Sequence, residues 1–365
     1  MHVVICGGGV IGACTAYFLA RRGIEVTVVE RCAVASSASG KAGGFLARDW
    51  CAGSPLDALA RRSFALHASL HKELGDWSYR RVSSYSGLFA PEGDRHPRPA
   101  SKLGWLSNGV TIGAQLSTIE TTAMVNPRAF TLGMMRAAEQ HGAGVRHGEV
   151  TGLSRSGDTI VGVDVDGETI AADAVVIALG PWSLRAAQWL RLPLVYGLQS
   201  PSLVYDTGTE VPAEALFLDY QDESGSAVTV EVFPRADGST HVCAFGSQPP
   251  LPMNPADVKP DPGAIDRLQT LCERLSPAFR PERIVARQAC FRPVTQDGLP
   301  LIGKVPRSEG AYIATGHSVW GILNAPATGE ALAELVADGS AETTDLAPFD
   351  PARLRPLDPA SLRIA

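Results

Sequence analysis

The N-terminal residues alternate apolar runs with turns in the order strand, helix, strand. Residues 2–6 form a β-branched run, and an apolar helical stretch extends to Arg22, where Gly23 suits the left-handed conformation that ends helices. Residues 24–29 form a second apolar run, which Glu30 closes. This pattern predicts the first strand–helix–strand unit of an α/β domain.

The middle of the chain predicts further helices and strands. Residues 54–74 predict a helix that begins at a capping serine followed by proline and ends before Gly75. Residues 126–142 and 263–275 predict two more helices, whereas residues 79–125 look irregular, with short strands and several prolines. Apolar runs at 143–150, 160–166 and 174–179 predict strands.

From residue 195 onward the pattern changes. Residues 195–246 alternate apolar and polar positions, which is typical of antiparallel strands with one buried face. Six prolines within residues 249–262 mark a connection between elements. We therefore expect an α/β fold, in which a Rossmann-like dinucleotide-binding domain, built from discontinuous segments, carries an inserted, mainly antiparallel α+β domain for substrate. The expected segments are 1–78, 126–192 and 286–365 for the cofactor domain, and 79–125 and 193–285 for the substrate domain.

The composition narrows the classes of protein that remain. Of 365 residues, 45% are hydrophobic and 19% charged, the profile of a globular protein. A net charge of −6 without a basic patch excludes nucleic acid as an expected partner. The apolar runs are too short for a transmembrane segment, and a strand follows Met1 so closely that we expect no signal segment. Seven cysteines without Cys-x-x-Cys spacing indicate reduced thiols, no metal site and an intracellular, cytoplasmic location.

A glycine fingerprint joins the first strand to the first helix. In Gly7-x-Gly9-x-x-Gly12, the first glycine permits the tight turn, the second lets a pyrophosphate approach the backbone, and the third lets the helix pack on the strand. Glu30 follows Gly12 by 18 residues, where its carboxylate can accept hydrogen bonds from ribose hydroxyls and would repel a 2′-phosphate. The fingerprint predicts the ADP half of a dinucleotide, bound at the N-terminus of a helix, and disfavours NADP.

Two further loops are rich in small residues. Residues 36–44 combine serines with glycines, which lets main-chain N–H groups reach a phosphate or a flat ring, although a flexible surface loop has the same composition. Near the C-terminus, residues 311–338 comprise a strand, the loop Gly316-His-Ser-Val-Trp-Gly321, and a helix. Because glycine-lined turns stand near both ends of the chain, they could hold the two ends of one cofactor, which favours flavin over nicotinamide.

Single residues exclude a nucleophile elbow and a zinc-hydrolase helix. A nucleophile elbow requires Gly-x-Ser-x-Gly, but Trp320 occupies the second glycine position of the loop around Ser318. His67 and His71 have the spacing of a zinc-hydrolase helix, but Ala68 stands where that motif needs glutamate. We therefore expect both histidines to lie on a solvated helix face.

These motifs together resemble the FAD-dependent D-amino-acid oxidase (DAO) family, near glycine oxidase and sarcosine oxidase. The resemblance covers most of the expected cofactor domain but little of the segments that would choose the substrate. It is carried by residues 3–30, 39–46, 125–127, 175–183 and 290–329, and by the strand that ends at Val150, whose main chain faces adenine in the family.

The resemblance implies FAD as the cofactor and assigns residues to it. Most of them lie in the glycine-lined turns and at strand ends. The cofactor-binding residues implied are Gly7, Gly9, Val10, Ile11, Gly12, Glu30, Arg31, Ser39, Gly40, Lys41, Gly43, Gly44, Phe45, Val150, Ala178, Gly180, Trp182, Gly316, Gly321, Ile322 and Leu323.

The block from Cys290 to Gly303 implies the chemistry. Arg292 falls on the family position whose guanidinium pairs with the substrate carboxylate, a two-pronged and charge-assisted contact, although a structural ion pair is the alternative. Cys290 falls where sarcosine-oxidase-like members bond covalently to flavin, yet the adjacent Arg-Pro favours the non-covalent branch. His317 and Trp320 complete the candidate catalytic set, and Trp320 departs from the glycine oxidase pattern.

The expected activity is oxidation of a small amine or amino acid. Hydride transfer to flavin N5 would give an imine that water hydrolyses, and O2 would reoxidise the flavin to yield hydrogen peroxide. The alternatives are a non-catalytic FAD-binding assembly or sensing factor, and an NAD-linked dehydrogenase. Four aromatic residues are candidates for the substrate pocket, although ordinary packing is the more common role of such residues: Trp50, Tyr205, Tyr220 and Trp320.

Overall fold

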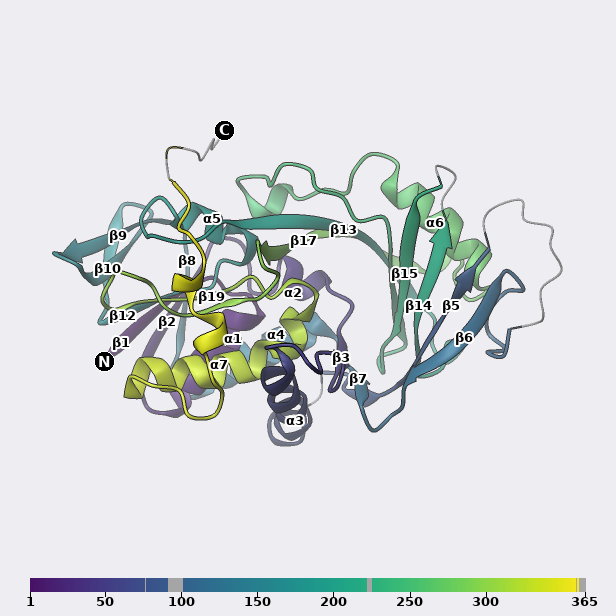
Figure 1. The fold of residues 1–365 in the computed structure, drawn as a ribbon, viewed down its shortest axis with the longest axis horizontal. Helices are drawn as coiled ribbons and strands as arrows, with labels where there is room; N and C mark the ends of the chain where they lie inside the picture. The colour runs from purple at the N-terminus through teal and green to yellow at the C-terminus, as the bar shows by residue number, and fades with distance from the viewer. Residues whose placement is uncertain (76, 91–100, 222–224, 359, 361–365) are drawn as a thin grey trace.

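The computed structural model describes residues 1–75, 77–90, 101–221, 225–358 and 360. It has the expected α/β fold, with a mainly parallel sheet at one end of an elongated molecule and a mainly antiparallel sheet at the other (Figure 1). The parallel sheet has six strands in the order β18-β19-β12-β1-β2-β8, and the antiparallel sheet has seven in the order β17-β13-β16-β15-β14-β5-β6.

The six-stranded sheet is buried on both faces. Along β1, Val3 and Ile5 point into one apolar core, whereas Val4 and Cys6 point into another on the opposite face. This explains why its strands are short, continuous apolar runs. All neighbours are parallel except β18, which runs antiparallel to β19 at the edge. The strands are β1 (His2–Cys6), β2 (Glu25–Glu30), β8 (Gly144–His147), β12 (Ala174–Ile177), β18 (Leu301–Lys304) and β19 (Ala311–Thr315).

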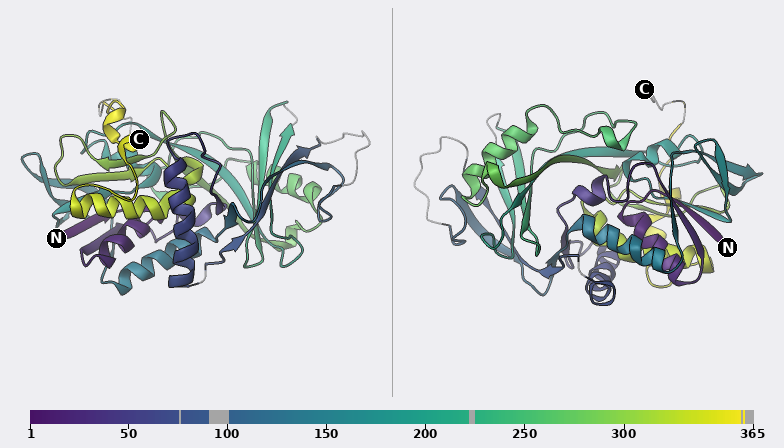
Figure 2. Two further views of the ribbon diagram at one scale, coloured as in Figure 1. Left: turned by 60° about the horizontal axis from the view of Figure 1, so that its bottom comes forward. Right: turned by 180° about the vertical axis from the view of Figure 1, so that it is seen from behind.

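Helices cover one face of this sheet and a small sheet covers the other. The helices α1, α4 and α7 lie side by side, and α3 packs across α7 (Figure 2). The opposite face is covered by the three-stranded sheet β11-β10-β9. The helices are α1 (Val10–Arg21), α3 (Asp57–Leu74), α4 (Pro127–Gln140) and α7 (Gly321–Asp338), and the covering strands are β9 (Val150–Ser156), β10 (Thr159–Val165) and β11 (Glu168–Ala171).

The seven-stranded sheet has one apolar face and one mixed face. Val230 and Val232 belong to the apolar core beneath α6, whereas Glu231 and Phe233, which alternate with them, line a cavity on the other face. The long strands β13 and β17 extend from this sheet toward the six-stranded sheet (Figure 1). The elements are β5 (Ser83–Phe89), β6 (Val110–Ser117), β13 (Val195–Asp206), β14 (Glu214–Gln221), β15 (Ala227–Pro234), β16 (Ser239–Cys243), α6 (Ala264–Leu275) and β17 (Ile284–Thr295).

Short elements complete the fold. A sheet in the order β3-β7-β4 lies between the two larger sheets, and the connection at 249–262 has one 3₁₀ turn. The division into a cofactor and a substrate domain remains our proposal. The short elements are α2 (Ala38–Lys41), β3 (Phe45–Ala47), β4 (Arg80–Arg81), β7 (Thr122–Met124), α5 (Ser183–Ala186) and the 3₁₀ turns Gly180–Trp182, Pro255–Asp257, Pro281–Arg283, Ser318–Trp320, Ala347–Phe349 and Pro351–Arg353.

Two expectations about these elements were wrong. The strand expected at 143–150 breaks at Gly148, where a Cβ would lie 2.5 Å from Val165 Cγ1, and the chain then leaves the six-stranded sheet. The helix expected from Ser54 begins at Asp57, because the Ser54 hydroxyl accepts a hydrogen bond from the N–H of Leu56 in a preceding turn. The short strands expected within residues 79–125 are present, and two of them, β5 and β6, belong to the large sheet, whereas the prolines at 91, 97 and 99 lie outside the described residues.

The expected solvated position of His67 was also wrong. His67 is fully buried between α3 and α7, and its Nε2 lies 2.9 Å from Ile322 O and 3.2 Å from Leu323 O. Pro326 lies inside α7 and has no N–H to donate to Ile322 O, so the imidazole supplies the missing donor. One turn earlier on α3, the Ser63 hydroxyl accepts from the N–H of Ala327 at 3.1 Å. Thus α3 satisfies the backbone groups that the proline disrupts.

Burial of His67 makes stability depend on pH. Desolvation lowers its pKa to about 4, so the unfolded chain binds a proton that the folded chain excludes. We expect the free energy of unfolding to fall as pH decreases from 6.5 toward 4, with up to about 1.4 kcal/mol per pH unit from this residue, and no contribution from it above 6.5. Urea unfolding across that range should show a shallower slope for His67→Gln. The exposed His147→Gln should keep the wild-type slope, and an unchanged slope for His67→Gln would contradict the assignment.

Candidate functional site

A cavity of about 460 Å³ lies between the six-stranded and the seven-stranded sheets. Its volume falls within the range of ligand-binding sites. On one side it is lined by the turns that follow β1, β2, β12 and β19, and on the other by the mixed face of β13 to β17. Ligands of open parallel sheets bind at the carboxyl ends of the strands, which is where these turns lie.

The first glycine turn is shaped by close backbone contacts. Gly7 has φ +113°, and a Cβ there would lie 2.4 Å from Ala178 O at the end of β12. A Cβ at Gly12 would lie 2.0 Å from Gly7 O, so only glycine lets α1 pack this close to the turn. The Ser39 hydroxyl accepts from the N–H of Val10 at 2.8 Å. The cavity is therefore bordered by the N-terminus of a helix, a favourable place for an anion.

Glu30 closes this turn. One of its carboxylate oxygens accepts from the N–H of Gly8 at 2.7 Å, and the other accepts from the N–H of Cys32 at 2.8 Å. Each carboxylate oxygen has a second lone pair, which leaves Glu30 able to accept from a hydroxyl of a ligand. Beside it, Glu149 pairs with Arg31 at 2.9 Å and with Arg185 at 2.6 Å.

The small-residue loop is held from the seven-stranded sheet. The Arg235 guanidinium, 7% exposed, donates to Ala42 O at 2.8 Å and to Gly43 O at 3.3 Å. The Gln288 amide donates to Lys41 O at 3.1 Å. Because both side chains bind main-chain carbonyls, the loop is an ordered wall of the cavity and does not match the flexible surface loop considered above.

His317 lies on the second glycine loop, where it lines the cavity and is 3% exposed. Its Nε2 lies 3.1 Å from the Thr328 hydroxyl of α7, and its Nδ1 has no partner among the described residues. Burial lowers the pKa of His317 to about 3, so the imidazole is neutral near pH 7. In this position it can exchange hydrogen bonds with a ligand but cannot serve as a cation.

Arg292 and Cys290 project from β17 into the cavity. Arg292 forms no ion pair within the described part of the chain, and its Nε is buried without a partner. The guanidinium reaches across β13, since a Cβ at Gly246 would lie 3.6 Å from its Nη2. Cys290 is 8% exposed, and burial raises the pKa of its thiol. The alternative role of Arg292 in a structural ion pair is therefore not supported.

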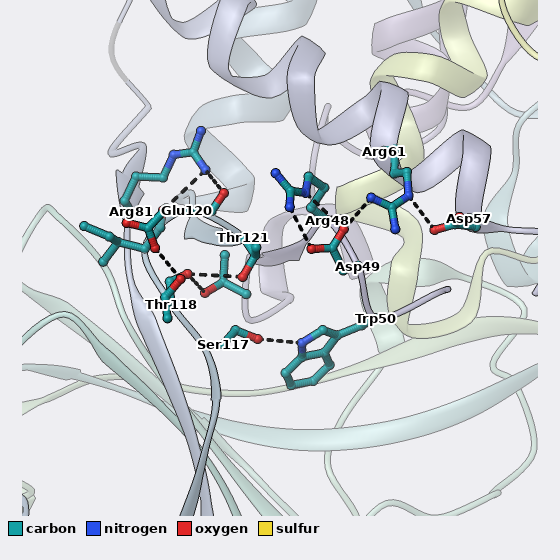
Figure 3. A network of polar contacts seen from close by, with 12 residues as sticks. Arg48, Asp49, Trp50, Asp57, Arg61, Arg81, Ser117, Thr118, Glu120 and Thr121 are labelled. Atoms are coloured by element: carbon teal, nitrogen blue, oxygen red, sulfur yellow. Dashed lines mark hydrogen bonds and ion pairs between the residues drawn. The ribbon is translucent and has the colours of Figure 1, made fainter. Parts of the chain in front are cut away.

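Aromatic rings form the rest of the wall. The Trp50 ring centroid lies 5.0 Å from that of Phe45, 4.8 Å from that of Phe217 and 6.4 Å from that of Trp320. The Trp50 indole donates to the Ser117 hydroxyl at 2.7 Å, and the adjacent Asp49 binds Arg48 and Arg61 (Figure 3). The Trp50 ring is thus held by its own hydrogen bond, and the chain next to it is held by the ion pairs of Asp49. In contrast, Tyr205 and Tyr220 lie in the core beneath α6.

The cavity gathers most of the residues expected from the sequence. All three catalytic candidates line it, as do all cofactor candidates except Gly12, Gly40, Gly316 and Leu323. Those four lie behind its wall, where small size or apolar packing matters. Sequence reasoning missed a group of lining residues whose neighbours come together only in the folded sheet. They are Glu149, Arg185, Phe217, Glu231, Phe233, His241, Cys243 and Met253.

The described residues show neither a metal centre nor a membrane-spanning helix. Among the residues that the structure describes, no three His, Cys, Asp or Glu side chains come together as a metal site would require. Within the same residues, no helix combines the length and the apolar character needed to cross a bilayer. All seven cysteines are free thiols.

Comparison with known proteins gives consistent results. Relatives include glycine oxidase of Pseudomonas aeruginosa, 29% identical over 378 residues (96% of this chain, 98% of the relative), and the uncharacterised oxidoreductase YurR of Bacillus subtilis, 28% identical over 391 residues (96% and 98%). The crystal structure of glycine oxidase from Geobacillus kaustophilus matches with a TM-score of 0.79 at 27% identity, covering 96% of this chain and 98% of that one. The L-proline dehydrogenase of P. horikoshii shares the fold, with a TM-score of 0.78 at 20% identity and coverage of 96% and 97%. The sequence profile of the DAO family, described as FAD dependent oxidoreductase, matches residues 2–335, so the chain belongs to this family of FAD-dependent oxidoreductases that act on amino acids and amines.

Proposed function

We propose that this protein oxidises a small amino acid, bound by its carboxylate to Arg292, with FAD as the electron acceptor. The observation that carries the proposal is the guanidinium of Arg292, without an ion-pair partner among the described residues, inside a mainly apolar cavity. A half-buried cation without a counter-ion is costly, and a ligand carboxylate would remove that cost. Family membership favours FAD over a nicotinamide cofactor and an enzyme over a non-catalytic scaffold.

The lining residues fit FAD. The N-terminus of α1 would bind the pyrophosphate, with the N–H of Ile11 as a donor because the N–H of Val10 already donates to the Ser39 hydroxyl, and Glu30 would accept from the ribose. The main chain at Val150, which lines the cavity next to Glu149, would contact adenine. The loop that Arg235 holds and the first turn of α7 would hold the ring system, since their backbones form opposite parts of the wall.

The protein's own groups would bind and orient the substrate. When bound, FAD supplies a hydride acceptor at flavin N5, and its reduced form can pass the electrons to O2 with release of hydrogen peroxide. Arg292 would hold the substrate carboxylate with two parallel hydrogen bonds, which fixes the orientation of the Cα–H bond. Neutral His317 would act as a hydrogen-bonding group, and Trp50 and Trp320 would exclude water. The imine product would be hydrolysed in solution.

Replacement of Arg292 tests the proposal. Once a screen of amino acids for peroxide release and anaerobic flavin bleaching has identified a substrate, Arg292→Ala should lower kcat/KM by about 10²-fold or more, the loss expected for a charge-assisted bidentate contact. Arg287→Ala, on the same strand and exposed outside the cavity, should retain the wild-type value. Wild-type kinetics of Arg292→Ala with every active carboxylated amine would overturn the assignment.

The attachment of the flavin is a separate prediction. Because burial raises the pKa of the Cys290 thiol, little nucleophilic thiolate is present, and we expect FAD to be bound without a covalent link. Acid precipitation of the purified protein should release the yellow colour into the supernatant, and Cys290→Ala should retain a bound flavin. Flavin that stays with the precipitate of the wild type but not of Cys290→Ala would show a covalent bond at this cysteine.

A further inference from the structure

Glu231 is a second charged side chain without a counter-ion in the cavity. It lies on the cavity face of β15, opposite Phe217 of β14 and Cys243 of β16. The Cys243 thiol donates to Glu231 Oε2 at 3.2 Å. Within the described residues, no lysine, arginine or histidine forms an ion pair with this carboxylate. Its negative charge is therefore free to be neutralised by a ligand.

The surroundings of Glu231 disfavour an isolated negative charge. Burial raises its pKa, and the positive charge of Arg292 opposes that rise, so the two groups share one electrostatic environment. Phe217 and Phe233 border the same part of the cavity, with ring centroids 5.6 Å apart. Ring faces attract cations but do not stabilise anions. A carboxylate beside these aromatic rings is thus complementary to a positively charged nitrogen.

Within the described residues, Glu231 and Arg292 form no ion pair with each other. They lie on β15 and β17, which β16 and β13 separate, so about three strand spacings of ~4.8 Å lie between their backbones. Both side chains point to the same face and line the same cavity. A small ligand that carries both charges can contact each of them at once.

We propose that Glu231 binds the protonated nitrogen of the substrate, so that the site selects zwitterionic amino acids over carboxylates that lack a cationic nitrogen. This inference rests on the proposed function, because it takes Arg292 as the carboxylate anchor. It adds an amine-recognition residue on a strand that sequence reasoning did not connect with the site. Glu231 then acts in specificity, and Cys243 keeps its carboxylate in place through the thiol hydrogen bond.

A matched pair of ligands tests the proposal without turnover. 2-Methylalanine is a zwitterion with no Cα–H to oxidise, and pivalate has the same skeleton with a methyl group in place of the ammonium. Calorimetric titration of the FAD-loaded wild type should show tighter binding of 2-methylalanine by about tenfold or more. Glu231→Gln should abolish this preference with little change for pivalate, whereas Asp219→Asn, an exposed charge on the neighbouring strand, should retain it.

The outcomes separate this inference from the proposed function. Equal affinities in the wild type, absence of 2-methylalanine binding, or an undiminished preference in Glu231→Gln would overturn the role of Glu231. The comparison in the wild type decides this even if the variant does not fold. Arg292→Ala should weaken both ligands, which tests the carboxylate anchor independently. If the preference holds but no amine is ever oxidised, the proposed function fails and the recognition of zwitterions stands.

Discussion

The contact between Gly7 and the end of β12 determines where the ligand-binding surface can form. A Cβ at Gly7 would lie 2.4 Å from Ala178 O, and one at Gly12 would lie 2.0 Å from Gly7 O. Only bare backbone allows β1, β12 and α1 to meet so closely. This close packing sets the N-terminus of α1 at the cavity, beside Glu30, where we propose that the diphosphate of the cofactor binds.

The opposite end of the cavity depends on contacts between distant segments. Helix α7 begins at the cavity with a proline in its second turn, and it keeps its backbone satisfied there because α3 supplies His67 and Ser63. The mixed face of the seven-stranded sheet supplies Arg292, Glu231 and the aromatic rings. In the proposed function, the side chains for substrate would therefore come from one sheet, and the backbone groups for the cofactor mainly from the turns of the other.

The parts that could be predicted from the sequence are those with local causes. The strand–turn–helix start, the end of α3 at Leu74 and the start of α4 after Asn126 follow from residues within one or two turns of each boundary. The family, the fold and FAD as the cofactor follow from motifs of that kind, and the comparisons confirm them. What could not be predicted depends on partners far away: the proline that explains the burial of His67 is in another helix, and β5 pairs with β14, more than a hundred residues later in the chain. In the sequence, Glu231 is only the polar position of an alternating strand. Its place opposite Cys243, and on the wall of the cavity, follows from the strand register, which the sequence does not show.

The hydrogen bonds from Arg235 to Ala42 and Gly43 affect how the molecule folds. The Arg235 guanidinium reaches the loop at Ala42 and Gly43 from 193 and 192 residues away along the chain. Contacts of such long range form only after the intervening segments have closed. The part of the cavity wall that would hold the flavin ring can thus become ordered only once β15 and β16 have paired. We therefore expect a nascent chain to bind flavin only after these strands have been synthesised.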